Sequence, residues 1–192
     1  MDQEIKSKID RYVVLGFGLC ILAVGWLLYL PNTAITPQDS SGSGLALAAI
    51  SNGIITPPGY PIYALISKFF INFISGNPIA GLSILSALLQ SLAAFIFFFL
   101  CFRVTHNTIL AFSLSFTWMV SEPVMRTAVD VGIYPLHNLI VIFLLYLLYR
   151  LYQGRQFSAY SSFLVGTVFG IGLANSFLIL LWLPFLLLLL SS

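Results

Sequence analysis

The 192-residue sequence has very few charged side chains, and this scarcity excludes an ordinary soluble domain. Only 7% of its residues are Asp, Glu, Lys or Arg, whereas 59% are hydrophobic and the mean hydropathy is +1.01. A soluble domain carries about 25% charged residues. Because too few polar side chains remain to cover a surface that faces water, the sequence predicts an integral membrane protein.

Basic, cysteine and histidine residues are scarce as well. The formal net charge is +2, and the charges fall at the ends of apolar runs, so no basic face for nucleic acid is expected. Cys20 and Cys101 lie inside apolar runs and are predicted to be small buried residues, not a disulfide. His106 is expected in a solvated turn and His137 at the start of a span, so the spacing predicts neither a metal nor a cofactor.

The long apolar runs, which lack a period-two alternation, predict an all-α bundle of about five to six transmembrane helices. A polar segment, residues 1–11, is expected in the cytoplasm, and residues 12–192 form the predicted transmembrane domain. The first run is followed by no small-residue cleavage site, so it is read as a retained helix. The predicted spans are residues 12–30, 79–102, 108–120, 135–151, 158–174 and 177–190.

Residues 31–78 are predicted to form the first outer loop, because they include the least apolar stretch, residues 31–60, which is rich in Ser, Gly and Pro. Residues 44–50 suit a short interfacial helix. The run of Pro57, Pro58, Gly59, Tyr60 and Pro61 then breaks any helix. Residues 61–74, with Lys68 in the middle, are too short to span comfortably and are predicted to be interfacial or re-entrant.

The distribution of Lys and Arg predicts a cytoplasmic N-terminus. With residues 61–74 on the outer side, only Lys68 and Arg126 lie outside. The predicted inner residues are Lys6, Lys8, Arg11, Arg103, Arg150 and Arg155. The sequence has no N-glycosylation sequon, which favours a bacterial inner membrane over the endoplasmic reticulum.

With this topology, the outer side collects charged groups from three segments, and ionisable groups beside apolar spans point to function. These groups are Asp39, Lys68, Glu122, Arg126 and Asp130. A second interpretation stays open, since exposed loops carry charges in any case, and Glu122, Arg126 and Asp130 have the spacing of surface ion pairs on a helix. Ser121 is expected to cap a helix with Pro123 in its first turn, followed by a polar connector over residues 125–134.

The stretch Gly53-Ile-Ile-Thr-Pro-Pro-Gly-Tyr-Pro-Ile-Tyr63, followed by Ile66-Ser-Lys-Phe-Phe70, resembles a known family. It is similar to the protein O-mannosyltransferases within the GT-C glycosyltransferase superfamily. Residues 83–94, 129–139 and 165–183 match later stretches of the same family in the same order. The resemblance extends from about residue 38 to residue 183.

The resemblance implies a GT-C-like membrane enzyme that takes a sugar from a polyprenyl-phosphate donor. Transfer would occur on the outer or luminal side, to a hydroxyl group of a protein or lipid. By this resemblance, Asp39 would be the general base and Lys68 and Arg126 would bind the donor phosphate, with Glu122 and Asp130 as supporting acidic residues. These residue types suit the chemistry, because an attacking alcohol needs a carboxylate and a departing phosphate needs a positive partner.

The sequence departs from the family pattern at its acidic positions. Counted back from Pro57, the two family acids fall on Ser41 and Gly44, with Asp39 two residues earlier. Likewise, the family glutamate of the later motif falls on Gly132, with Asp130 two residues earlier.

Three interpretations therefore stay open: an active transferase, a catalytically silent membrane subunit of the same fold, and a transporter part, for which no inverted repeat is present. Asp39 could equally be a helix cap, and Lys68 could extend to the lipid headgroups. Because the chain stops inside an apolar run and relatives are longer, we expect a fragment or a shortened relative.

Overall fold

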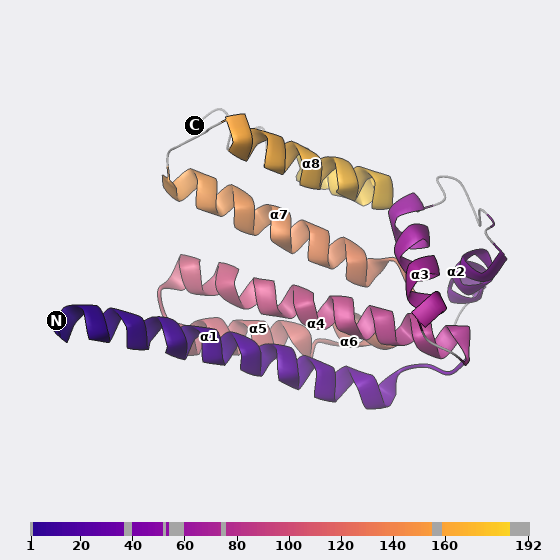
Figure 1. Ribbon diagram of the computed structural model, residues 1–192, viewed down its shortest axis with the longest axis horizontal. Coiled ribbons are helices and arrows are strands. Elements are labelled where there is room, and N and C mark those ends of the chain that lie inside the picture. The colour runs from indigo at the N-terminus through magenta and orange to yellow at the C-terminus, as the bar shows by residue number, and fades with distance from the viewer. Residues whose placement is uncertain are drawn as a thin grey trace.

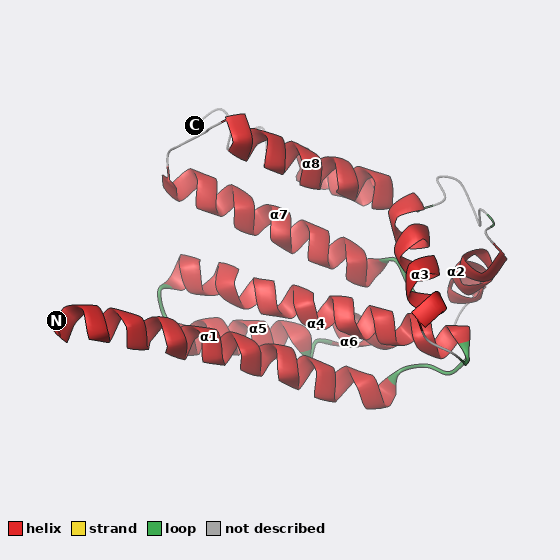
Figure 2. Cartoon of the chain, in the orientation of Figure 1, coloured by secondary structure: helices red, strands yellow, loops and turns green. Residues whose placement is uncertain are grey.

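The computed structural model describes residues 2–36, 40–51, 53, 60–73, 76–154 and 159–184. Within these residues, every regular element is a helix (Figures 1 and 2). Long helices run side by side, and short helices lie at the end of the bundle away from the N-terminus (Figure 1). This arrangement confirms the predicted all-α membrane fold.

Among the described residues, three helices are long and apolar enough to cross a membrane. They are α1 (Asp2–Tyr29), α4 (Pro78–Thr105) and α7 (Tyr134–Gly154), with candidate spans of 22, 28 and 20 residues. About 20 helical residues cover the ~30 Å of a bilayer core. Helix α1 begins at Asp2, so the predicted cytoplasmic segment and the first span share one helix.

Helix α4 lies at the centre of the bundle and separates two hydrophobic cores. Leu82 and Leu85 face the core that contains residues of α7 and α8 (Ala159–Asn175). Ala87 and Ala94, on the opposite side of α4, face the core shared with α1 and α5 (Thr108–Met119). The two faces of the same helix therefore serve different halves of the molecule.

Helix α5 and helix α6 (Glu122–Val129) form one bent path whose axes differ by 63°. Pro123 has no N–H to bond the carbonyl of Met119 four residues earlier. The hydroxyl of Tyr29 donates to that carbonyl instead, at 2.8 Å and inside the core. The missing N–H of Pro123 therefore explains the bend, and the hydrogen bond from the Tyr29 hydroxyl stabilises it.

Two details of the predicted α6 region need correction. The expected polar connector over residues 125–134 is helical as far as Val129. Ser121 occupies the N-cap position, but its hydroxyl donates to the carbonyl of Trp118 at 2.7 Å and does not cap α6. The helix forms because its apolar positions, Val124 and Ala128, are buried in the bundle four residues apart.

Helices α2 (Ser40–Ser51) and α3 (Pro61–Phe73) lie at the bundle end, and α3 runs across the long helices (Figure 1). At about 1.5 Å per residue, α3 is too short to span a bilayer. The same end is closed by loop contacts: the Asn77 side chain donates to the carbonyl of Ile35 at 2.8 Å and caps α4. The short helix predicted at residues 61–74 is therefore confirmed.

Helix α8 runs antiparallel to α7, and a 3₁₀ helix, η2 (Phe177–Trp182), follows it. The predicted span over residues 177–190 is described only to residue 184, and its described part begins with η2. By length and composition, the described residues contain three spanning helices, or four if the bent pair of α5 and α6 counts as one. The larger number predicted from the sequence counted α8 and residues 177–190 as spans.

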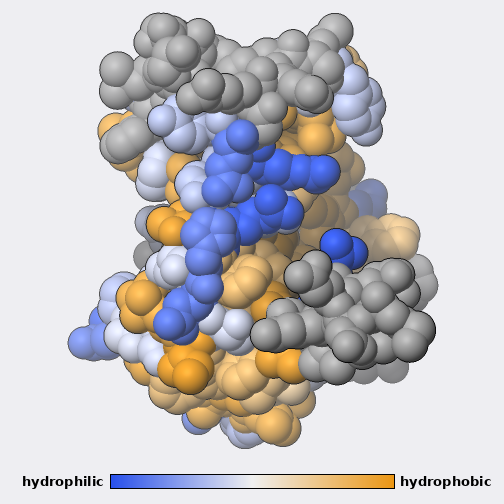
Figure 3. Space-filling view, turned by 90° about the vertical axis from the view of Figure 1, so that its left-hand side faces the viewer, coloured by the Kyte–Doolittle hydropathy of each residue, from blue (hydrophilic) through white to orange (hydrophobic). Residues whose placement is uncertain are grey.

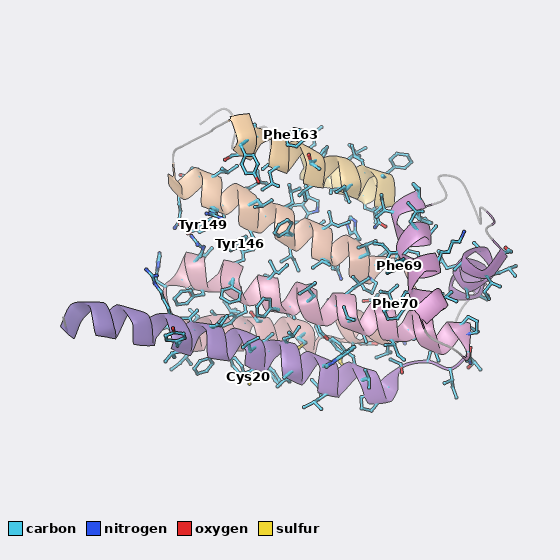
Figure 4. All side chains as sticks on the ribbon, viewed as in Figure 1. Cys20, Phe69, Phe70, Tyr146, Tyr149 and Phe163 are labelled. Carbon is cyan, nitrogen blue, oxygen red and sulfur yellow. The ribbon has the colours of Figure 1, made fainter. Side chains whose placement is uncertain are left out.

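The cysteine prediction holds for one residue and fails for the other. Cys101 is buried, but Cys20 is exposed on α1 (Figure 4). A helix at the edge of a membrane bundle turns part of its apolar surface to lipid, so an apolar run does not by itself predict burial within the protein.

Candidate functional site

Of the outer residues predicted from the sequence, Lys68 lies at the bundle end that α3 crosses, because it is on that helix (Figure 1). Arg126 is on α6. The carbonyl of Val129, at the end of α6, accepts the N–H of Ala34, just beyond α1, at 2.8 Å. This bond places the end of α6 beside the end of α1 that is far from the N-terminus.

Part of the predicted turn motif lies outside the described residues, and so does Asp39. The residues outside are Asp39, Pro57, Pro58 and Gly59. Tyr60 has a φ of 44°, a left-handed conformation that a bulky residue rarely adopts. Its carbonyl accepts the N–H of Ala64 at 2.9 Å, and Pro61 opens α3, where the missing N–H costs nothing. The described part of the motif therefore starts α3.

Lys68 and Arg126 lie on opposite sides of α4. Lys68 is exposed on α3, which packs on α2, α4 and α8, whereas α6 packs on α1, α4, α5 and α7. Arg126 pairs with Glu122 at 3.6 Å, and both side chains are about 80% exposed. Such an exposed pair contributes little stability, so the guanidinium group stays accessible to a ligand.

Asp130 lies in the loop between α6 and α7 and is half-buried. Its Oδ1 accepts the N–H of Val131 at 2.7 Å, which orients the carboxylate. Burial raises the pKa of Tyr63 on α3 to about 12, and the charge of Asp130 acts in the same direction. The hydroxyls of Ser67 and Ser86 oppose this shift. Asp130 therefore lies beside a buried group of hydroxyls.

A polar stripe inside α4 continues this group into the bundle. Ser83, Ser86 and Gln90, at i, i+3 and i+7, lie on one helix face, and each is 0% exposed. The Oε1 atom of Gln90 accepts a hydrogen bond from Nδ2 of Asn138 on α7 at 3.1 Å. This bond ties α4 to α7 near the middle of α4.

Helices α7 and α8 add further buried polar atoms. Gly172 of α8 packs against Ile140 of α7, where an added methyl group would lie 3.1 Å from Ile140 Cγ2. Because the helices are antiparallel, Asn175 lies about one turn nearer the start of α7, where His137 is. Nδ1 of His137 and both amide atoms of Asn175 are buried without a hydrogen-bond partner.

These side chains form one feature, which we name the polar layer. Its members are Tyr63, Ser67, Ser83, Ser86, Gln90, His137, Asn138 and Asn175. Polar side chains between membrane helices often serve as structural contacts, and the bond between Gln90 and Asn138 is one. The buried hydroxyls of Tyr63, Ser67 and Ser86 lie close to one another inside an apolar bundle, and such a polar cluster points to a functional role.

Sequence reasoning missed the polar layer, although a signal was present. Polar residues recur at helical spacing inside apolar runs, as Ser83, Ser86 and Gln90 do in α4 and as Tyr63 and Ser67 do in α3. Reading each run only for its length and hydropathy concealed this spacing. The side on which several such stripes meet became visible only in the fold.

An apolar groove of about 320 Å³ opens between α4, α7 and α8. Its walls include Leu92 and Ile96 of α4, Leu139 of α7 and Val168 of α8. Every described residue that lines the groove is apolar. An apolar chain of a ligand would find a matching surface here.

Comparison with known proteins completes the description of the site. No curated protein and no solved structure matches the chain. The protein O-mannosyl-transferase TMEM260 N-terminal domain family matches residues 42–192, which include every helix from α3 onward and most of α2. This match confirms the resemblance to O-mannosyltransferases that the turn motif carried. The chain therefore belongs to the family of the protein O-mannosyl-transferase TMEM260 N-terminal domain.

Proposed function

We propose that this chain is the membrane-embedded part of a glycosyltransferase. It transfers a sugar from a polyprenyl-phosphate donor to a hydroxyl group of a protein or lipid, on the outer or luminal side of the membrane. The observation that carries this proposal is membership of an O-mannosyltransferase family over residues 42–192. The family name favours mannose as the sugar and a protein as the acceptor.

The proposed reaction needs a base and a positive group at one end of the bundle. A carboxylate takes the proton of the acceptor hydroxyl, whose oxygen attacks the anomeric carbon of the sugar. The bond from that carbon to the phosphate oxygen breaks, and its electron pair leaves with the phosphate, where a cation stabilises the charge. We assign Asp39 as the base, with Glu122 and Asp130 as supporting acidic residues.

The resemblance offers two candidates for the contact with the donor phosphate, Lys68 and Arg126. Because α4 lies between them, one phosphate group in a single site contacts only one of the two in the described arrangement. Lys68 is the better candidate, since α3 also carries Tyr63 and Ser67 of the polar layer. The apolar groove between α4, α7 and α8 supports the proposal, because an isoprenoid chain needs an apolar surface.

Asp39 can be tested in membranes that contain the full-length natural protein, supplied with a labelled polyprenyl-phosphate mannose donor and a Ser/Thr-containing acceptor peptide. Replacing the base removes the proton acceptor, so Asp39→Asn should lower kcat by about 10²- to 10⁴-fold. Asp10→Asn is the matched control, because this carboxylate is predicted at the opposite end of the bundle. Full activity in Asp39→Asn would reject Asp39 as the base.

A catalytically silent subunit of the same fold is the second candidate. The observation that favours it is the presence of Ser41 and Gly44 where the resembling family has its two acidic residues. In the same assay, this candidate predicts that the unmutated protein transfers no mannose, although it is correctly inserted and folded. Transfer by the unmutated protein would exclude it.

A further inference from the structure

Three arginines gather at the bundle end opposite α3. Arg11 is on α1, Arg103 on α4 and Arg150 on α7. An added methyl group at Gly18 of α1 would lie 3.0 Å from the Phe99 ring of α4, and the helices are antiparallel. Two turns back along α1, Arg11 is therefore level with the last turn of α4, which contains Arg103.

Contacts with α7 hold Arg103 in place. Its guanidinium carbon lies 5.6 Å from the centre of the Tyr146 ring, a cation–π contact. The hydroxyl of Tyr149 donates to the carbonyl of Arg103 at 3.1 Å, and the Gln153 amide donates to the Tyr149 hydroxyl at 2.9 Å. Tyr146 and Tyr149 both lie near the C-terminal end of α7 (Figure 4). Arg103 is thus oriented before any ligand arrives.

The three guanidinium groups have no carboxylate partner within 4.0 Å among the described residues. A helix dipole explains Arg103, which lies in the last turn of α4. It does not explain Arg11, which lies in the N-terminal half of α1. Nor does it explain the cation–π contact between Arg103 and the Tyr146 ring. An excess of fixed positive charge therefore remains at this end.

Exposed tyrosines indicate how deeply this end lies in the membrane. Tyrosine is enriched where a bilayer meets water. Tyr12, Tyr152 and Tyr160 are exposed near the ends of α1, α7 and α8 that lie on this side. The end face itself carries a continuous hydrophilic stripe between apolar flanks (Figure 3). The arginines are therefore at the level of the lipid headgroups.

We propose that this end binds the headgroup phosphate of an anionic phospholipid, with Arg103 and Arg150 as the direct contacts and Arg11 as a neighbouring charge. A planar guanidinium group binds two phosphate oxygens at once. The unpaired positive charge favours a net negative headgroup over a zwitterionic one. The site lies away from the polar layer, so the inference is independent of the proposed sugar transfer.

The test titrates the purified full-length protein, in detergent, with phosphatidylglycerol or phosphatidylcholine and follows thermal unfolding. Ligand binding to the folded state raises the unfolding midpoint. Phosphatidylglycerol should therefore raise the midpoint at concentrations about tenfold below those at which phosphatidylcholine does. The double substitution Arg103→Gln and Arg150→Gln should remove this tenfold preference while leaving the midpoint without lipid near its original value.

The matched control is the double substitution to Lys, which keeps both charges and loses the two-point contact. It should keep part of the preference for phosphatidylglycerol. Equal responses to the two lipids, or an unchanged preference in the Gln variant, would overturn the proposal. A full shift with inorganic phosphate alone would also overturn it, because the site would then take a free anion.

Discussion

The hydroxyl of Tyr63 lies in the core where α3 meets α4, and only 1% of this side chain is exposed. Removing its proton would place a charge among apolar side chains and near the carboxylate of Asp130. Burial is the main reason that the pKa of Tyr63 rises to about 12. The phenol is therefore neutral at any physiological pH.

This pKa predicts how stability depends on alkaline pH. An unfolded tyrosine ionises near pH 10.0, so between pH 10.0 and about 12 the unfolded chain loses the Tyr63 proton while the folded protein keeps it. The contribution is fully present below pH 10.0 and falls by about 2–3 kcal/mol as pH rises to 12. Tyr63→Phe should show a smaller loss over this window when unfolding is followed by denaturant titration. Identical pH dependence in both proteins would contradict the burial of this hydroxyl.

At the residue scale, the sequence predicted which charges would be exposed but not which groups would meet. Lys68 and Arg126 are exposed, as charged residues beside apolar helices should be. The charge of Asp130 acts on Tyr63, and these residues are far apart in the sequence, so no local pattern encodes the interaction. The spacing of Glu122 and Arg126 did predict their ion pair, because i and i+4 are neighbours on any helix.

At the element scale, close packing of α1 on α4 depends on a glycine. A methyl group on Gly25 would lie 2.9 Å from Oγ of Ser91 and 3.2 Å from Sδ of Met119. Ser91 has little freedom to move, because its hydroxyl donates to the carbonyl of Ala87 at 2.7 Å. Small residues at such contacts let membrane helices approach closely.

Gly25→Ala should therefore destabilise the protein by about 1–3 kcal/mol through overpacking. Gly16→Ala is the matched control in the same helix, since nothing lies within 4 Å of its added methyl group. The control should be neutral or stabilising by up to about 1 kcal/mol, because Ala favours a helix. Unfolding in mixed micelles compares the two variants, and equal effects would refute the proposed contact.

The sequence predicted helices correctly where their own composition determines them. It predicted them less well where packing against another helix determines them. The proline-rich turn and the length of residues 61–74 sufficed to predict a short α3. The helix start at Pro123 was also predicted, but not the continuation of α6 to Val129. That continuation depends on burial against α1 and α4, and the bend before it depends on the Tyr29 hydroxyl from α1. Neither is visible in the local sequence.

At the scale of the whole molecule, the two bundle ends differ in chemistry. One end carries the crossing helix α3 with Lys68, and the polar layer extends from it toward the middle of α4. The other carries Arg11, Arg103 and Arg150, with exposed tyrosines near them. The distribution of basic residues predicted a difference between the two ends, because the positive-inside rule compares loops on the two sides and needs no tertiary contact. This rule could not predict the polar layer, because it counts only Lys and Arg.

The central claim is that Lys68 and Arg126 face the same compartment, opposite Arg150. Cysteines placed singly at these positions, with Cys20 and Cys101 replaced by Ala, can be labelled in intact cells with a membrane-impermeant maleimide. We predict that Lys68→Cys and Arg126→Cys react from outside, whereas Arg150→Cys reacts only after the membrane is permeabilised. If Lys68→Cys and Arg126→Cys instead reacted from opposite sides, α3 would have to cross the membrane, and the proposed site would be contradicted.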